Sequence, residues 1–243
     1  MKKFYSIFLI ALFLVPSSTL KAQDHEDAFM SWNTINVSKT LEKNNKWTLG
    51  VISEYRHQVH EGVSRMNQYL IRPSVAYKVL PWLTLKYQMD FAAVGGSNTI
   101  TLENGETFVS EAAFNWRFIP EVSISHKVGD FSMSFRQRAQ TTWKVKANTN
   151  STVLRSRAKA EYSIPRTPMG LHFAIEPYWC DFSKNSFAWL QKIRWYAGFD
   201  FKLTDTMTFT PEYVCQAYHN RRGRYDRRTY DDHVLYMTLT IKL

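Results

Sequence analysis

Hydrophobic and polar residues alternate along most of the chain that follows residue 22. Between Trp82 and Phe91, every second residue is apolar and the residues between them are mostly polar or charged. The same two-residue period runs through four further segments: residues 131–143, 154–164, 193–203 and 235–243. A period of two places successive side chains on opposite faces of a β-strand, so these segments are predicted to be strands with one apolar and one polar face.

The predicted strands are long and carry charges in the middle of their polar faces. Segments of about ten residues with an unbroken apolar face are typical of membrane-crossing strands, whereas strands in soluble sandwiches have about five or six residues. A packed soluble core would not accept charges at mid-strand. A closed barrel in lipid accommodates both faces, with the apolar one outward and the polar one in the lumen. We therefore predict an all-β fold, an antiparallel up-and-down transmembrane β-barrel of about 10–12 strands.

The sequence leaves the exact number of strands open. Ten crossings follow from Trp47 onward, and residues 29–40 form an eleventh, whereas bacterial single-chain barrels have even counts. Either the first segment does not cross completely, or residues 23–31 contribute part of a twelfth strand.

The predicted connections fall into two sets. Short turns are expected near residues 43–45, 80–81, 129–130, 166–170 and 204–205. Longer or more polar loops are expected near residues 57–65, 95–105, 146–151, 181–186 and 219–232. Outer-membrane barrels have short periplasmic turns and longer external loops, which places Leu243 in the periplasm. The hairpin signal Asn104-Gly105 makes residues 82–103 and 106–127 one pair of long strands that project beyond the membrane.

The N-terminus is typical of an export signal. Lys2 and Lys3 precede an apolar run, which is followed by Pro16, two serines and the small residue Ala22. We expect cleavage after Ala22, with residues 1–22 as the signal peptide and residues 23–243 as a single barrel domain in the bacterial outer membrane. Cleavage lowers the net charge from +10 to +7, because it removes three lysines and no acidic residue.

Aromatic residues are concentrated near the ends of the predicted strands: Trp47, Tyr55, Trp82, Trp143, Tyr162 and Trp179. In a membrane barrel such rings form girdles at the level of the lipid headgroups. The alternative, aromatics of an ordinary core, would require a second sheet to pack against.

The polar faces carry many charges that are predicted to point into the lumen. Ten of them are candidate ligand-binding residues: Arg56, Arg72, Arg117, Arg136, Arg138, Arg155, Arg157, Arg194, Glu121 and Glu161. Further charges in the same phase are Lys86, Lys159, Lys202, Glu54, Asp90, Glu111, Glu176, Asp200 and Glu212. Because an unpaired buried charge is costly, these groups must pair or stay hydrated. They form either an ion-pair network that fills the lumen or a cationic pore or pocket for an anionic solute.

Few residue patterns in the sequence indicate a catalytic site. His172 and Glu176 lie four residues apart on one strand, hence about 13 Å apart and too far for a direct acid–base pair. The seven histidines show no metal-ligand spacing, and no cofactor is implied. A lipase or acyltransferase would need a Ser, a His and a carboxylate near the outer leaflet, and Ser183, His219 and Asp231 are in suitable loops. We expect a barrel without enzymatic activity, with an outer-membrane lipid-modifying enzyme as the alternative.

Expected partners follow from the location. Residues 221–228 contain five arginines in the last predicted external loop, where they are either solvated or bound to phosphates of lipopolysaccharide. The other expected partners are outer-membrane lipid and the barrel-assembly machinery. Nucleic acid is not expected at a surface outside the cell, and the oligomeric state does not follow from the sequence.

Several short motifs resemble a bacterial family known as domain of unknown function 2490. They are the early Trp32, the acidic strand Glu54-Tyr55-Arg56, the strand Leu70-Ile71-Arg72-Pro73-Ser74-Val75-Ala76-Tyr77, and the arginine-rich pairs Phe135-Arg136-Gln137-Arg138 and Leu154-Arg155-Ser156-Arg157. The third departs from the family's Leu-Arg-Pro pattern by one inserted residue. The resemblance covers about residues 27–243 and implies a secreted barrel, with an N-terminus similar to Bacteroidetes exports. It implies no reaction and no catalytic residues.

The sequence therefore predicts an outer-membrane β-barrel protein that is structural or provides a narrow, porin-like passage for small solutes, anionic ones included.

Overall fold

The computed structural model describes residues 28–41, 45–60, 63–94, 98–101, 107–110, 113–146, 148–180, 189–218 and 231–243. Within these ranges all regular structure is β-strand, as the two-residue period predicts, and no helix there is long and apolar enough to span a membrane. The strands are β1 (Ala28–Thr40), β2 (Trp47–His60), β3 (Val63–Leu80), β4 (Leu83–Val94), β5 (Asn98–Thr101), β6 (Thr107–Ser110), β7 (Ala113–Val128), β8 (Phe131–Lys144), β9 (Thr149–Ser163), β10 (Met169–Cys180), β11 (Trp189–Lys202), β12 (Met207–Tyr218) and β13 (Asp231–Lys242).

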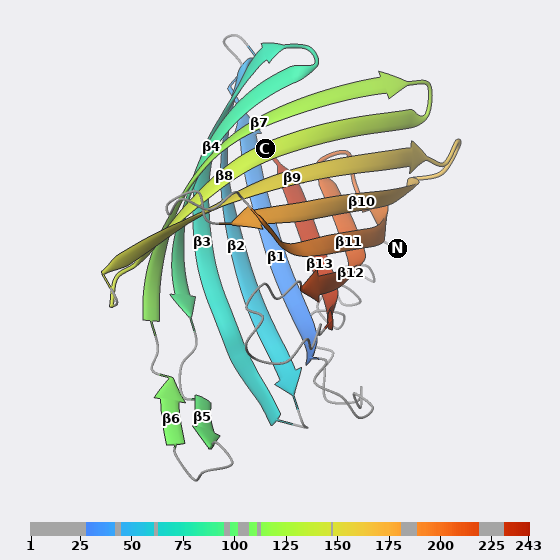
Figure 1. Cartoon of the computed structure of the whole chain (residues 1–243). Helices are drawn as coiled ribbons and strands as arrows, with labels where there is room; N and C mark the ends of the chain where they lie inside the picture. Colours follow the sequence, from blue (N-terminus) through green and yellow to red (C-terminus); the bar gives the residue numbers. More distant parts are fainter. Residues whose placement is uncertain are drawn as a thin grey trace.

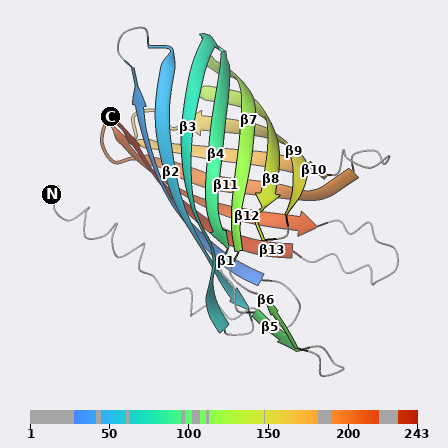
Figure 2. The same cartoon turned by 90° about the vertical axis from the view of Figure 1, so that its left-hand side faces the viewer.

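Eleven of these strands form one closed barrel (Figures 1 and 2), in the order β1-β2-β3-β4-β7-β8-β9-β10-β11-β12-β13 and back to β1. All neighbours are antiparallel except β1 and β13, which pair in parallel from Ala28↔Asp232 to Ser38↔Lys242. An odd number of alternating strands brings the first and last strands together in the same direction. The predicted all-β barrel of about 10–12 strands is confirmed.

Both explanations for the conflict over the strand count are wrong. β1 is a complete strand of 13 residues, so the first segment does cross. The barrel closes through β1 and β13, and no twelfth strand is needed. Because β1 and β13 pair in parallel, the barrel closes with an odd number of strands, whereas the sequence led us to expect an even number.

Four of the five predicted short turns are confirmed at one end of the barrel, here called the short-turn end, and the fifth, near residues 43–45, lies mostly outside the described residues. The connections there are residues 41–46, 81–82, 129–130, 164–168 and 203–206. At the opposite end, here called the loop end, two of the predicted connections are shorter than their polar composition suggested. β2 and β3 continue until His60 and Val63 pair with each other, and residues 145–148 alone join β8 to β9. In both places the strand ladder satisfies backbone groups despite the polar composition that predicted a loop.

The predicted long strand pair at residues 82–103 and 106–127 is interrupted. β4 and β7 belong to the barrel, whereas β5 and β6 form a separate two-stranded sheet. This sheet projects beyond the loop end, away from the C-terminus (Figures 1 and 2). The sequence between β4 and β5 contains Gly95-Gly96, and glycine disfavours a continuous strand.

The two faces of the strands separate as the alternation predicts. On β4, Leu85 is 44% exposed on the outer surface, whereas Asp90 is fully buried in the lumen. On β11, Trp195 is exposed and its neighbour Arg194 is buried. A small apolar core lies inside the barrel and is made of Met30, Trp32, Ala174, Tyr196, Val214 and Val234. The rest of the described lumen is lined mainly by polar and charged side chains.

Four of the six aromatic side chains predicted to form girdles are exposed near strand ends, whereas Tyr55 is exposed nearer the middle of β2 and Trp179 is only partly exposed. Trp47, Trp82 and Tyr162 are exposed near the short-turn end, and Trp143 is exposed near the loop end. Amphipathic rings at these two levels suit the interfaces of a bilayer, where one edge of the ring stays hydrated.

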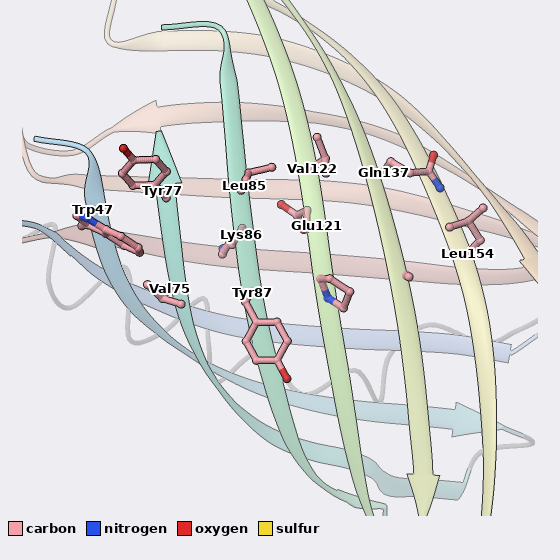
Figure 3. Close-up of a pocket in the computed structure, with 12 residues that line it drawn as sticks. Trp47, Val75, Tyr77, Leu85, Lys86, Tyr87, Glu121, Val122, Gln137 and Leu154 are labelled. Carbon is pink, nitrogen blue, oxygen red and sulfur yellow. The ribbon is translucent and has the colours of Figure 1, made fainter. Parts of the chain in front are cut away.

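An outward-facing apolar hollow of ≈ 590 Å³ lies across the six neighbouring strands from β2 to β9 (Figure 3). Its lining includes Val75, Leu85, Tyr87 and Val122. Because the outer side chains of these strands face the membrane, the hollow belongs to the lipid-contacting surface and not to the lumen.

Four prolines interrupt the barrel wall in the middle of their strands: Pro73 in β3, Pro120 in β7, Pro177 in β10 and Pro211 in β12. Proline has no backbone N–H to donate to a ladder. Pairing of β3 with β4 stops at Ile71↔Phe91 and resumes at Ser74↔Gln88. Comparable gaps occur between β7 and β8, between β9 and β10, and between β11 and β12. Each proline adjoins a charged lumen residue: Arg72, Glu121, Glu176 or Glu212.

Several predictions concern residues outside the described part of the chain. They are the signal peptide of residues 1–22 with its cleavage after Ala22, Glu111, Ser183, His219 and the arginine-rich residues 221–228. These stay predictions.

Candidate functional site

The candidate lumen residues all lie on barrel strands, and most of them surround one cavity. The cavity is lined by seven of the eight candidate arginines and by Glu121: Arg56, Arg72, Arg136, Arg138, Arg155, Arg157 and Arg194. Arg117 does not line it, but its guanidinium lies 3.5 Å from Asp90. Glu161 lies nearer the short-turn end, where it pairs with Lys159 at 2.5 Å. That these residues bind a ligand stays a prediction.

The cavity has a volume of ≈ 220 Å³ and draws its lining from nine of the eleven barrel strands. Eight cationic side chains line it, the seven arginines and Lys86, against two carboxylates, Glu54 and Glu121. The other lining residues are Trp32, Asn36, Ile52, Gln88, Tyr196 and Tyr236. The charged residues meet at one level because each is in the lumen phase near the middle of its strand.

Four of the arginines form a compact group on β8 and β9, here called the arginine patch: Arg136, Arg138, Arg155 and Arg157. Arg136 lies directly opposite Arg157, and Arg138 lies directly opposite Arg155. Like charges that face each other across two strands destabilise a sheet unless other groups compensate for them. The patch therefore needs negative partners from elsewhere in the lumen.

Three carboxylates from other strands provide these partners. Glu121 on β7 accepts two hydrogen bonds from Arg138, at 2.9 and 2.5 Å. Glu176 on β10 accepts bonds from Arg136 at 2.8 Å and from Arg155 at 3.1 Å. Glu212 on β12 accepts a bond from Arg157 at 3.2 Å.

Aromatic rings hold several of the same cations. Arg56 and Arg194 lie over the ring of Trp32, at 4.3 and 4.8 Å from its centroid. Arg157 lies 4.1 Å from the ring centroid of Tyr196, and the Tyr196 hydroxyl donates to Glu176 at 2.6 Å. Stacking of a guanidinium on an aromatic face is favourable when both are desolvated. These contacts fix the arginine planes around the cavity.

The stretch of wall from β2 to β4 contains two smaller ion pairs. Arg72 on β3 donates from Nε and Nη2 to both carboxylate oxygens of Asp90 on β4. Arg56 donates to Glu54 at 2.5 Å, and Thr34 donates to the same carboxylate at 3.4 Å. Charge-assisted bidentate bonds of the Arg72 type are strong and geometrically specific.

A second polar cluster lies nearer the short-turn end and is here called the His172 cluster: His172, Asp200, Thr210 and Glu212. His172 Nδ1 lies 3.0 Å from Asp200, and Nε2 lies 2.9 Å from Glu212. A ring that carries both protons donates to both carboxylates. Thr210 donates to Asp200 at 2.7 Å. The prediction that His172 and Glu176 do not pair fits this arrangement, because His172 contacts carboxylates from two other strands.

The sequence reasoning missed part of the lumen lining. Tyr196 and Tyr236 line the cavity, and Tyr178 stacks with Arg155 and Arg194. Tyr196 and Tyr178 have the same two-residue phase as the predicted charges Arg194 and Glu176, so the alternation could have identified them. Attention to charged residues alone left them out.

The described residues test the alternative, a lipid-modifying enzyme, only in part. No group of three His, Cys, Asp or Glu side chains there is arranged to hold a metal. Of the three residues considered for such an enzyme, Asp231 begins β13, and the other two lie outside the described ranges.

The chain matches a known family over most of its length. A family described as "Protein of unknown function (DUF2490)" matches residues 29–227. The chain belongs to this family. The DUF2490 match includes the whole arginine patch and the three carboxylates that pair with it, so the resemblance seen in the sequence motifs is confirmed. No curated protein matches the chain.

Among solved structures, "Outer-membrane expressed OmpT of Vibrio cholerae" is similar, with a TM-score of 0.42 and 12% identity over 72% of this chain and 56% of that chain. The chain thus spans little more than half the length of that structure. The barrel of this DUF2490 chain is established by its own strand pairing. A closed all-β wall, apolar outside and polar inside, is the fold of an outer-membrane β-barrel.

Proposed function

We propose that the protein is an outer-membrane barrel whose lumen gives small anions a narrow passage. The observation that carries the proposal is the lining of the central cavity, where eight cationic side chains face two carboxylates. Fixed positive charge in a low-dielectric constriction raises the local concentration of anions and repels cations. The lumen therefore selects by charge at its middle level.

The size of the cavity supports a passage for small solutes only. Its volume of ≈ 220 Å³ is below the roughly 300–1,000 Å³ of typical sites for drug-sized ligands. Lining from nine strands around so small a space leaves room for hydrated ions and not for large substrates. The expected conductance is correspondingly low.

A second function, a closed structural barrel, is favoured by ion pairs that reach across the lumen. Arg157 on β9 pairs with Glu212 on β12, and Arg194 on β11 stacks on Trp32 of β1. Each contact joins strands that lie three places apart in the barrel. If these contacts persist in the membrane, they block the passage.

Planar bilayer recordings in a KCl gradient test the proposal. The purified protein should give a small conductance with an anion-favouring reversal potential. Arg138→Glu combined with Arg155→Glu should weaken or reverse that preference. Because these changes break ion pairs, Lys86→Glu provides a second variant: Lys86 pairs with no residue that the structure describes.

The control is Lys202→Glu, the same charge reversal at an exposed position of the lumen phase outside the cavity. It should change the preference less than Lys86→Glu. A correctly folded barrel without conductance would exclude the passage and favour the structural role. A conductance that prefers cations would contradict the assignment of the cavity.

A further inference from the structure

Among the residues that the structure describes, the charges around the cavity remain unbalanced after the ion pairs described above are counted. Besides Glu54 and Glu121, three more carboxylates pair with lining arginines: Asp90, Glu176 and Glu212. Eight lining cations thus meet five carboxylates, an excess of three positive charges. Arg117 shares Asp90 with Arg72 and adds a further cation. Because uncompensated buried charge is costly, the site favours an anion that supplies more than one negative charge.

Several residues that line the cavity have buried donor atoms without a hydrogen-bond acceptor. The Nε atoms of Arg136, Arg155 and Arg157 and the indole Nε1 of Trp32 are buried, and none has a hydrogen-bond partner among the described residues. Trp32 is 3% exposed. A buried donor that lacks an acceptor loses the free energy of its hydrogen bond with water. All four residues line the cavity, but these atoms themselves have almost no accessible surface, so an acceptor in the cavity would reach them only after the side chains turn.

Lys86 adds a cation that is not committed to a neighbour. It lines the cavity from β4 and makes no ion pair or hydrogen bond within the described part of the chain. The nearby Glu121 bonds to Arg138 instead. The cavity therefore has cationic donors from six strands: Lys86 on β4 and the arginine patch on β8 and β9, with Arg56, Arg72 and Arg194 on β2, β3 and β11.

We infer that the cavity is a binding site for a compact, multiply charged oxyanion of the phosphate type. This inference rests on the proposed anion-accepting lumen and names its ligand. A tetrahedral oxyanion presents acceptor oxygens in every direction, as donors on several walls require, and guanidinium groups bind such oxygens in their forked geometry. A larger organic anion would need apolar contacts, and Ile52 is the one aliphatic lining residue in this cavity.

The size of the cavity agrees with this ligand class. A volume of ≈ 220 Å³ corresponds to about seven water molecules at roughly 30 Å³ each. One phosphate with a few bridging waters fits into that space. The carboxylates bond to other atoms of Arg136, Arg155 and Arg157 and leave their Nε donors without an acceptor, whereas the Nε of Arg138 donates to Glu121.

The test is calorimetric titration of the full chain in detergent micelles with inorganic phosphate, at constant ionic strength with chloride as the reference anion. Phosphate should bind at one site per barrel and raise the urea midpoint of unfolding, whereas chloride should do neither. Lys86→Gln should weaken phosphate binding about tenfold, the effect of one charge-assisted hydrogen bond. Without phosphate, the same variant should be at least as stable as the wild type, because it removes an uncompensated charge.

Two further variants separate ligand binding from folding. Trp32→Phe removes the indole N–H but keeps a ring for Arg56 and Arg194, and it should also weaken phosphate binding. Lys202→Gln is the control with the same loss of charge outside the cavity, and it should bind phosphate like the wild type. Equal losses in Lys86→Gln and Lys202→Gln, or no stabilisation by phosphate beyond that by chloride, would overturn the inference.

A lipid headgroup carries the same phosphate chemistry, and a short-chain phosphatidic acid distinguishes the two sources. We expect free phosphate to bind and the lipid not to compete, because side chains of nine strands enclose the cavity. Displacement of bound phosphate by the lipid, or binding of the lipid without binding of free phosphate, would overturn the assignment. Phosphate binding in a barrel that conducts no anions would support this site and reject the passage. Anion conductance without saturable phosphate binding would do the reverse.

Discussion

Two polar regions of the lumen share Glu212 but differ in how their charges are balanced. Around the cavity, each of the five carboxylates has a cationic partner and several cations remain in excess. In the His172 cluster, one imidazole lies between two carboxylates, and Thr210 donates to one of them. The cluster satisfies its members with protein groups alone, whereas the cavity does not. A polar network whose groups are all satisfied by the protein stabilises the fold, whereas a network with unsatisfied cations is suited to binding an anion.

The largest effect that this comparison predicts is at Glu176, which holds two arginines of the patch. Glu176→Gln keeps the size of the side chain but removes the charge that Arg136 and Arg155 share. Breaking a buried ion pair by removing one partner costs about 3–5 kcal/mol. Urea unfolding of the purified barrel should show a loss of that order. A loss below about 1 kcal/mol would mean that the patch is hydrated and needs no carboxylate.

A smaller effect is expected in the His172 cluster, at Gly198. A Cβ atom there would lie 2.6 Å from the Pro211 carbonyl oxygen and 2.8 Å from both Glu212 Cγ and His172 Nε2. Gly198→Ala should therefore cost about 1–3 kcal/mol, as overpacking does. Gly170→Ala is the control, because its nearest atom, the Tyr162 carbonyl oxygen, is 3.3 Å away. Equal losses in the two variants would show that the cluster is not closely packed around Gly198.

The smallest effect is expected at the pair of Glu161 and Lys159, nearer the short-turn end. The side chain of Glu161 is 37% exposed, and exposed ion pairs contribute about 0–1 kcal/mol. Glu161→Gln should change the unfolding free energy within this range. The difference between Glu176→Gln and Glu161→Gln measures how strongly the depth of a carboxylate in the lumen determines its importance. A cost at Glu161 equal to that at Glu176 would contradict the division of the lumen into two regions.

The alternating pattern predicted the barrel because successive side chains of a strand point alternately to its two faces, whichever strand pairs with it. Arg138 and Arg155, for example, were placed in the lumen by the period of two. Which carboxylate pairs with which arginine was not predictable. Arg157, for example, pairs with Glu212 three strands away, and such a contact depends on the curvature of the barrel and the register of its strands. The parallel seam of β1 with β13 was likewise missed, because a closing contact between the two ends of a chain has no local signal. Tyr178 and Tyr196 had the correct parity and were overlooked as uncharged residues.

The four mid-strand prolines have a mechanical consequence for the barrel. Each gap in the ladder lies between two strands that a short turn joins, at β3–β4, β7–β8, β9–β10 and β11–β12. The ladders between these pairs run past the level of the gaps, with one bulge at Tyr178/Trp179 between β10 and β11, so each pair is loosened near its middle while its neighbours stay paired. Such a wall can change its cross-section at one level without separating at either rim. That level is set by Arg72, Glu121, Glu176 and Glu212, the residues that adjoin the prolines, so a movement at these gaps would widen or tighten the ring of charge inside.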